Sequence, residues 1–211
     1  MNSIKNIVIF VSGGGSNFKS IHKSIMNKEI SGHISLLITD NSNSRALDYA
    51  KSQLIDFKII NKSFFNSYQE YSTYLLSTLD DICPDLIILA GYIKKIPELI
   101  ISNYKLKILN IHPSLLPKFG GKGFFGINIH KAVIKSKEFF SGATVHFVTE
   151  NYDEGPIIYQ KKIEVRDNEK AENLAKRILE IEHQIYPYII GRFCSNEIKW
   201  INGQPQIKGV G

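Results

Sequence analysis

An asparagine and a histidine two positions apart, Asn110 and His112, lie in the stretch "ILNIHPSLLPKFGG" at residues 108–121. Side chains alternate across a strand, so these two point to the same side of the strand. A carboxamide can donate an N–H to a developing oxyanion, and an imidazole can accept or donate a proton near neutral pH. Pro113 and Pro117 restrict the backbone that follows. The stretch therefore predicts a rigidly held pair suited to acyl transfer to an amine.

A third group is expected beside such a pair, namely a carboxylate that orients the imidazole and stabilises its charged form. Asp153, in "ENYDEGPII", is the candidate because it lies in a short loop between two predicted strands. Sequence order does not by itself bring Asp153 near His112. The plainer alternatives are an ordinary turn acid and a structural histidine at a strand end.

The glycine-rich stretch "SGGGSN", residues 12–17, joins a predicted strand to a predicted helix. Its glycines let backbone N–H groups approach an anion, and the helix amino terminus adds a favourable dipole. The stretch lacks the lysine of a P-loop, and Phe18 takes the place of the third glycine of a dinucleotide fingerprint. We interpret it as a phosphate-binding loop. Two alternatives are a turn in which Ser16 or Asn17 caps the helix, and a nicotinamide-nucleotide site with Asp40 as the ribose-binding acid.

The elements that must position these groups are apolar, β-branched strands without polar alternation, which is typical of strands covered on both faces. They are predicted at residues 5–11, 33–39, 57–60, 85–91 and 107–112. Helical patterns lie between them, one after the glycine-rich stretch and one over residues 66–79. This alternation predicts a parallel sheet, whose ligands bind beyond the carboxyl ends of its strands. We therefore expect the polar loops to meet in one crevice.

A different pattern begins after residue 120, where a glycine-rich loop leads into a helix at residues 128–137. Strands are predicted at 142–149 and 156–165, and a long helix from about Asp167, which Pro187 should bend or end. The sequence predicts one doubly wound, mostly parallel α/β domain with an antiparallel strand addition in its C-terminal part. A phosphate-binding half would cover about 1–105 and a catalytic half about 106–211.

Composition excludes several classes of protein. The chain has 211 residues, 43% of them hydrophobic, and its formal net charge of +6 comes from scattered lysines separated by acids. This favours a solvated surface over a nucleic-acid-binding stripe. Cysteines and histidines lack metal-ligand spacing, and no run approaches the roughly 18 apolar residues of a membrane helix. We predict a cytoplasmic monomer or weak homodimer with small-molecule substrates, without metal, membrane or nucleic acid.

Five stretches, in order, resemble the phosphoribosylglycinamide formyltransferases, a family of folate-dependent enzymes of purine biosynthesis with a Rossmann-like fold. They are "SGGGSN", "PDLIILAGYIKKIP", "ILNIHPSLLPKFGG", "GATVHFVTENYDEGPII" and "EHQIYP", and they span about residues 4 to 200. "NIHPSLLP" is shared across the formyltransferase superfamily, including methionyl-tRNA formyltransferase and formyltetrahydrofolate hydrolase and dehydrogenase. "SGGGSN" and the chain length favour the glycinamide family.

The resemblance implies formyl transfer from 10-formyltetrahydrofolate to the amine of glycinamide ribonucleotide. A protonated His112 would stabilise the tetrahedral oxyanion together with Asn110, and Asp153 would raise the pKa of the histidine. His146 would support the site, and the region at 120–130 is assigned no chemistry. The implied site residues are, for catalysis, Asn110, His112 and Asp153; for the ribonucleotide, Gly15, Ser16, Asn17 and Glu182; and for folate, Ile93, Lys94, Lys95, Ile96, Asn110 and Tyr68.

Tyr68 departs from the family pattern, because members often have an arginine there, at a position associated with the folate tail. The folate glutamate would then be held by a nearby lysine or left in solvent. Three alternatives to the transferase stay open at this point: a hydrolase that uses the same residues with water, an enzyme that uses NAD(P), and a protein that binds its ligand without turnover.

Overall fold

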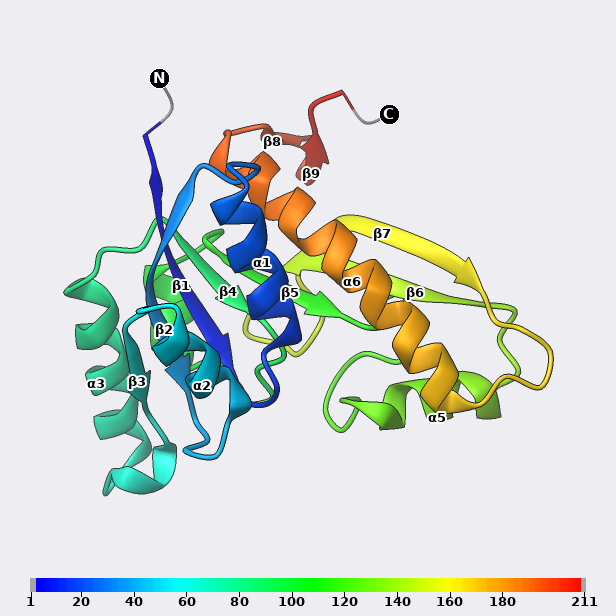
Figure 1. Cartoon of the computed structure of the whole chain (residues 1–211), viewed down its shortest axis with the longest axis horizontal. Helices are drawn as coiled ribbons and strands as arrows, with labels where there is room; N and C mark the ends of the chain where they lie inside the picture. The colour runs from blue at the N-terminus through cyan, green and yellow to red at the C-terminus, as the bar shows by residue number, and fades with distance from the viewer. Residues whose placement is uncertain (1–2, 210–211) are drawn as a thin grey trace. The chain divides into compact units, whose positions relative to one another are not determined.

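The computed structural model describes residues 3–209 and contains a seven-stranded sheet in the order β3-β2-β1-β4-β5-β6-β7, with a separate β8-β9 hairpin (Figure 1). β1 pairs in parallel with β2 and β4, β2 pairs in parallel with β3, and β6 pairs antiparallel with β7. The predicted α/β class, mostly parallel with an antiparallel addition, is confirmed.

The strands are β1 Lys5–Val11, β2 Gly32–Thr39, β3 Phe57–Ile59, β4 Leu86–Leu89, β5 Ile108–His112, β6 Phe140–Phe147, β7 Ile157–Glu164, β8 Ile198–Ile201 and β9 Gln204–Ile207. The helices are α1 Ser16–Met26, α2 Arg45–Ser52, the 3-10 helix η1 Lys62–Phe64, α3 Tyr68–Asp80, α4 Glu98–Asn103, α5 Ile127–Lys135 and α6 Ala171–Cys194. The contacts group into two compact units that divide inside β5, after Leu109. The functional division of the chain at about residue 105 stays a prediction.

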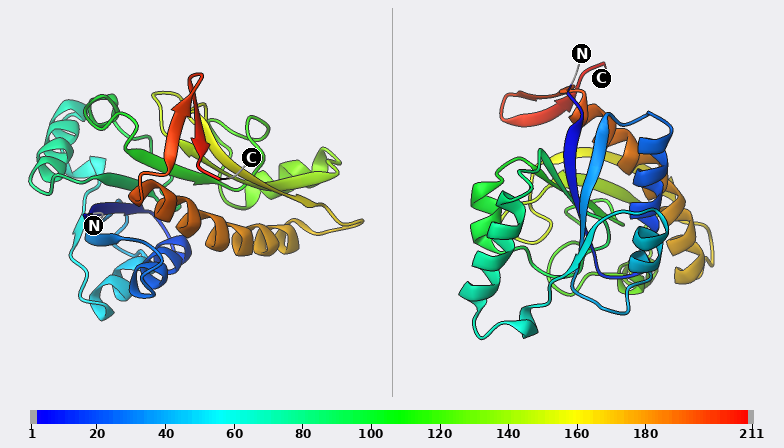
Figure 2. Two further views of the ribbon diagram at one scale, coloured as in Figure 1. Left: turned by 90° about the horizontal axis from the view of Figure 1, so that it is seen from above. Right: turned by 60° about the vertical axis from the view of Figure 1, so that its left-hand side comes forward.

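In the unit that ends at Leu109, β1 and β4 are buried on both faces over most of their length, whereas β3 at the sheet edge is not. α1 and α2 cover one face and α3 and α4 the other (Figure 2, right). All four residues of β4 are buried, as are the last five residues of β1. Burial on both faces accounts for the lack of polar alternation in these strands. The doubly wound arrangement places the polar residues that follow β2, β3 and β4 at the carboxyl ends of parallel strands.

The sequence analysis missed the short elements α2, α4, η1, β8 and β9. α2 owes its start to a side-chain cap, since the Ser44 hydroxyl accepts a hydrogen bond from the Ala46 amide at 3.3 Å. The β8-β9 hairpin turns through Asn202 and Gly203, both at positive φ. Elements of three to eight residues carry too few apolar positions for a clear period.

In the unit that begins at Asn110, α6 packs on β6 and β7, and α5 packs on α6. Pro187 does not end this helix, because α6 continues to Cys194, and a bend at the proline stays a prediction. Ile185, Tyr186, Ile189 and Ile190 are buried on both sides of the proline. Their packing outweighs the one backbone hydrogen bond that proline cannot donate.

The start of α6 also differs from the prediction, since the helix begins at Ala171 rather than near Asp167. The preceding residues form a turn in which the Glu169 carboxylate accepts from the Arg166 amide at 3.0 Å and from Arg177 at 2.8 Å. A side chain that caps a turn in this way competes with helix formation.

Candidate active site

Asn110 and His112 lie at the end of β5 and share one neighbour, Asp153, within the second unit. His112 is 4% exposed and Asn110 is half-buried. Both side chains approach the carboxylate of Asp153, so they point to the same side of the strand, as the alternation of a strand requires.

Asp153 lies between the two side chains and uses a different oxygen for each. Its Oδ2 is 3.5 Å from His112 Nδ1, and its Oδ1 is 3.5 Å from Asn110 Nδ2. These separations are longer than tight hydrogen bonds, which are about 2.7–3.0 Å. The structure therefore brings together the amide, the imidazole and the carboxylate that the sequence analysis singled out, and their catalytic roles stay predictions.

His146 on β6 fixes the orientation of the Asn110 amide. Its Nδ1 lies 2.8 Å from the carbonyl oxygen of Phe147, which can only accept, so Nδ1 carries a hydrogen. In the neutral ring Nε2 then accepts from Asn110 Nδ2 at 3.1 Å. One N–H of the Asn110 amide is thereby used, and the other is left for the weak contact with Asp153 or for a reacting oxygen. This is the supporting contact expected of His146.

Two opposing effects act on the pKa of the His112 imidazole. Burial lowers the pKa of His112 below its ordinary value, although the Asp153 carboxylate and the Phe119 carbonyl both act to raise it. The expectation that Asp153 raises the pKa of His112 agrees with the direction of its effect, but desolvation of the charged ring outweighs the attraction of this one carboxylate. Near neutral pH the ring is neutral.

The carboxylate is the charged member of the site. Burial raises the pKa of Asp153, but the two neighbouring histidines, His146 and His112, and the amide of Gly121 together lower it below its usual range. A stable anion thus faces a neutral imidazole that can take up a proton next to it.

The exit from β5 is held by β6 and β7 as well as by its prolines. Thr144 Oγ1 donates to the Ser114 carbonyl at 2.6 Å and accepts from the Leu116 amide at 3.1 Å. Gln160 Nε2 donates to the Leu116 carbonyl and to Thr144 Oγ1, each at 2.9 Å. The turn that follows His112 is thus tied to the neighbouring strands β6 and β7 by hydrogen bonds.

The sequence analysis missed one contributor, the segment Phe119–Gly121. The Phe119 carbonyl lies 2.8 Å from His112 Nε2, and the Gly121 amide donates to Asp153 Oδ2 at 2.9 Å. Both contacts are made by backbone atoms, so side-chain chemistry did not reveal them. The available signal was the cluster of glycines at 120, 121, 123 and 126.

In the first unit, the glycine-rich loop 12–17 leads into α1 with Gly15 as the N-cap, at φ +69°, and without a side-chain cap. The alternative in which Ser16 or Asn17 caps the helix is therefore wrong. Gly15 is required by packing, because a Cβ there would lie 2.7 Å from Ala46 Cβ. An amino terminus without a side-chain cap keeps its N–H groups and its dipole available to an anion.

Two side chains from the segment after β2 hold the carbonyl groups of this loop. Ser44 Oγ donates to the Gly13 carbonyl at 2.6 Å, and Asn41 Nδ2 donates to the Ser12 carbonyl at 3.1 Å. The loop is thus shaped by side chains that engage its acceptors, which suits a backbone whose donors face a ligand.

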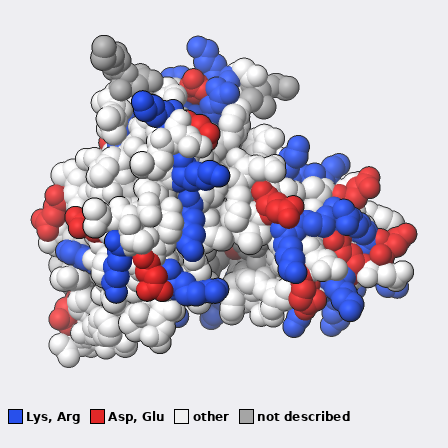
Figure 3. All heavy atoms as spheres, in the orientation of Figure 1, with Lys and Arg blue, Asp and Glu red and all other residues white. Residues whose placement is uncertain are grey.

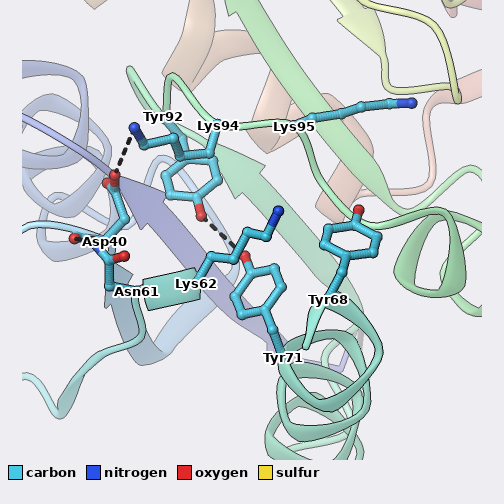
Figure 4. Close-up of a pocket in the computed structure, with 8 residues that line it drawn as sticks. All are labelled: Asp40, Asn61, Lys62, Tyr68, Tyr71, Tyr92, Lys94 and Lys95. Carbon is cyan, nitrogen blue, oxygen red and sulfur yellow. Dashed lines mark hydrogen bonds and ion pairs between the residues drawn. The ribbon is translucent and has the colours of Figure 1, made fainter. Parts of the chain in front are cut away.

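The first unit also contains a pocket of about 550 Å³ at the carboxyl ends of β2, β3 and β4 (Figure 4). It is lined by Asp40, Asn61, Lys62, Tyr68, Tyr71, Tyr92, Lys94 and Lys95. The Lys62 ammonium lies 4.9 Å from the centroid of the Tyr68 ring, and Lys94 is 3.8 Å from Asp40. A lysine beside a tyrosine ring, with a second lysine in the same pocket, suits a ligand with both aromatic and anionic parts. Lys95 points away from the rings (Figure 4) and lies 3.3 Å from Glu98.

The remaining predicted residues differ in exposure. Ile93 is 51% exposed and follows β4, whereas the side chain of Ile96 packs into the interior and is 2% exposed. The Ile93 amide donates to Ser12 Oγ at 3.1 Å, which ties the segment after β4 to the glycine-rich loop. Glu182 lies on α6 and is buried. Their contacts with substrates stay predictions.

Within residues 3–209, no group of three or more histidine, cysteine or acidic side chains is arranged to hold a metal ion. No helix in that range has the length and apolarity needed to span a membrane. Basic and acidic side chains are interspersed over the face shown in Figure 3.

The chain belongs to the formyl transferase family, whose sequence profile matches residues 5–190. Among curated proteins it is 41% identical to the chloroplastic phosphoribosylglycinamide formyltransferase of Arabidopsis thaliana, over 93% of this chain and 68% of that protein. It is 31% identical to the phosphoribosylglycinamide formyltransferase of Escherichia coli, over 94% of each. Among solved structures, glycinamide ribonucleotide transformylase 1 from Symbiobacterium toebii superposes with a TM-score of 0.89 at 30% identity, over 97% of this chain and 94% of that one.

Proposed function

We propose that this protein transfers the formyl group of 10-formyltetrahydrofolate to the amine of glycinamide ribonucleotide, a step of purine biosynthesis. The observation that carries this proposal is that the Asn110 amide and the His112 imidazole each lie 3.5 Å from the carboxylate of Asp153. The curated relatives named for this reaction support the choice of substrates. An amide donor, a neutral base and an anion are the groups that acyl transfer to an amine requires.

Proton transfer can be completed by His112 alone. As the amine nitrogen bonds to the formyl carbon, Nδ1 of the neutral ring accepts the proton that the amine loses. The formyl oxygen becomes an oxyanion, which the free N–H of Asn110 and the newly formed imidazolium stabilise. When the bond between the formyl carbon and N10 of the folate breaks, the imidazolium returns the same proton to N10. The ionised Asp153 stabilises the transient imidazolium.

In this proposal several residues outside the catalytic group bind the two substrates. The backbone of Gly15, Ser16 and Asn17 would hold the phosphate at the start of α1, and Glu182 on α6 would contact the glycinamide moiety. For folate, the segment Ile93–Ile96 would line the pterin site.

The folate tail is assigned to the lysine-lined pocket. Lys62 offers positive charge next to Tyr68, and Lys94 lies in the same pocket beside Asp40, so lysines would replace the arginine that many family members have at residue 68. A carboxylate of the folate glutamate is the anion expected there. Tyr68 then serves as an aromatic wall rather than as a charged ligand.

We further propose, from composition alone, that the protein is cytoplasmic and acts as a monomer or weak homodimer on small molecules. The folate is a co-substrate, and the reaction as proposed needs no metal.

A formyl-transfer assay with glycinamide ribonucleotide tests the proposal. We expect formylated ribonucleotide to form in an amount equal to the tetrahydrofolate released. Formate release without the amine would instead indicate a hydrolase, and a change in nicotinamide absorbance with NAD(P) would indicate an oxidoreductase.

In the same assay, His112→Ala and Asp153→Ala should bind folate but turn over about 10²–10³-fold more slowly. Near-normal turnover by either variant would contradict the catalytic assignment.

A further inference from the structure

We propose that the backbone segment Phe119–Gly121 positions the catalytic pair, holding His112 in the tautomer with hydrogen on Nε2 and holding Asp153 Oδ2 opposite Nδ1. The inference rests on the proposed function for its catalytic meaning, but its structural content can be measured without an activity assay. This segment lies in the glycine-rich region to which the sequence analysis assigned no chemistry.

The first half of the inference concerns which ring nitrogen of His112 reacts. The Phe119 carbonyl oxygen is 2.8 Å from Nε2 and has no hydrogen to give, so Nε2 carries a hydrogen whether the ring is neutral or charged. Nδ1 is then the nitrogen that gains and loses a proton. It is also the nitrogen that faces Asp153, at 3.5 Å. The carbonyl of Phe119 thereby directs the basic lone pair of the imidazole toward the carboxylate side of the site.

The second half concerns Asp153. The same oxygen that faces His112 Nδ1, Oδ2, accepts the Gly121 N–H at 2.9 Å, which is shorter than its separations from the side chains of the site. This distance is shorter than those of the other carboxylate oxygen, Oδ1, which lies 3.5 Å from Asn110 Nδ2 and 3.6 Å from His146 Nε2. The Gly121 amide therefore decides where Oδ2 lies. The carboxylate can approach the histidine only as closely as this segment permits.

Packing explains why the middle residue is glycine. A Cβ at Gly120 would lie 3.1 Å from Asp153 Cβ and 2.5 Å from Leu116 Cδ2. The backbone of the segment thus lies directly against the Asp153 side chain. Any larger residue would have to move either that side chain or the turn after β5.

The segment is itself held at both ends. Before it, Ser114 Oγ donates to the Lys118 carbonyl at 2.7 Å, and Lys118 pairs with Glu138 at 2.9 Å. After it, the Phe124 ring stacks edge-on against Phe119 with centroids 6.2 Å apart. Phe119 adopts φ +57°, an uncommon conformation for a residue with a Cβ. A strained, anchored backbone beside catalytic groups is expected where geometry must be kept within narrow limits.

The direct test is nitrogen NMR of the wild-type protein labelled with ¹⁵N-histidine. The His112 signals, assigned by their loss in His112→Gln, should show a protonated Nε2 and a bare Nδ1 above the titration of the ring. A hydrogen on Nδ1 in the neutral ring would overturn the inference. This outcome is independent of formyl transfer, so it is distinguishable from failure of the proposed function.

Two glycine variants test the positioning of Asp153. Gly120→Ala introduces the clash described above. Gly123→Ala is the control in the same loop for backbone strain alone, because alanine is strained at φ +96° but its added Cβ has no atom within 4 Å and does not touch Asp153. We expect Gly120→Ala to lower kcat at least about 10-fold with KM for the ribonucleotide within about twofold. Gly123→Ala should keep kcat within about twofold of wild type.

The NMR titration of His112 separates positioning from general damage to the loop. If Gly120→Ala moves the carboxylate away, His112 loses the charge that favours its protonation and titrates at lower pH than in wild type. Gly123→Ala should leave the titration unchanged. Equal titration of His112 in both variants and the wild type would overturn the positioning role of Gly120, even if kcat had fallen.

Discussion

The residues of the site share one carboxylate. Asp153 faces His112 with one oxygen and Asn110 with the other, at 3.5 Å in both cases. Burial favours the neutral imidazole, whereas the carboxylate opposes this effect. The balance gives a base that is unprotonated at rest and accepts a proton at little cost, because the charge it gains lies beside an anion.

The pH dependence of kcat/KM tests this balance. Because His112 must be neutral to accept the proton, and because burial lowers its pKa, activity should fall on the acid side at a pH below the ordinary histidine value of 6.5. Asp153→Asn removes the charge that raises the pKa of His112. The acid limb of this variant should therefore move to still lower pH while kcat falls about 10²-fold or more.

The substrate amine also titrates, but it does so equally with the wild type and with Asp153→Asn. Comparing the pH profiles of kcat/KM of these two proteins on the same ribonucleotide therefore removes its effect. A loss of wild-type activity as pH rises through the histidine titration would contradict the neutral-base mechanism, since it would mean that the imidazolium is the active form.

At the scale of elements, β6 organises the turn after β5. Thr144 is fully buried, and its hydroxyl joins Ser114 and Leu116 across the turn while it also accepts from Gln160. The histidine that precedes this turn is fixed by contacts that a strand alone does not supply. The two prolines and the threonine act together, since prolines limit the backbone angles and the hydroxyl satisfies the polar groups that the turn exposes.

Thr144→Val should destabilise the protein by about 2–4 kcal/mol, although valine has nearly the same shape. It leaves the buried Leu116 N–H and one acceptor at Ser114 without the hydroxyl, and unsatisfied buried groups cost about 1–3 kcal/mol each. Thr144→Ser keeps the hydroxyl and should lose about 1 kcal/mol for one methyl group. Urea unfolding of the three proteins measures the difference. A loss in Thr144→Val no larger than the loss in Thr144→Ser would contradict the stabilising role assigned to the hydroxyl.

At the scale of the whole molecule, buried histidines make the folded state sensitive to acid. Burial is the main cause that lowers the pKa of His22, His112, His130 and His183, and that of His130 falls to about 4. Since each folded pKa lies below the ordinary value of 6.5, the unfolded chain binds protons first as pH falls. The stability contributed by the neutral histidines is complete above pH 6.5 and is lost between 6.5 and the folded pKa. Asp153 and Glu169, whose pKa values are lowered, add losses in the same direction at lower pH.

We therefore expect Tm to decrease steadily from pH 7 to pH 4. In His130→Gln the side chain is neutral at every pH, so this contribution disappears. The variant should lose roughly 3–8 °C less than wild type over that range. Scanning calorimetry at several pH values measures both curves. Parallel curves for the two proteins would contradict the assignment of His130 as a group that resists protonation in the folded state.

Several features of this protein were determined by the sequence by itself, because they depend on neighbours along the chain. Apolar β-branched runs form strands wherever both faces are covered, and alternation puts Asn110 and His112 on one side. The glycines before the first helix include its N-cap, Gly15, and the phosphate assigned to this loop stays a prediction. The motifs around these residues were specific enough to indicate the family.

Only the tertiary structure decided the properties that depend on groups distant in sequence. Asp153 lies 43 positions from Asn110 yet is within 3.5 Å of it, and backbone atoms of Phe119 and Gly121 complete the site. The protonation of His112 depends on its burial, and the course of α6 through Pro187 depends on its packing. Desolvation and packing are sums over all neighbours in space, so a pattern read along the chain does not determine them.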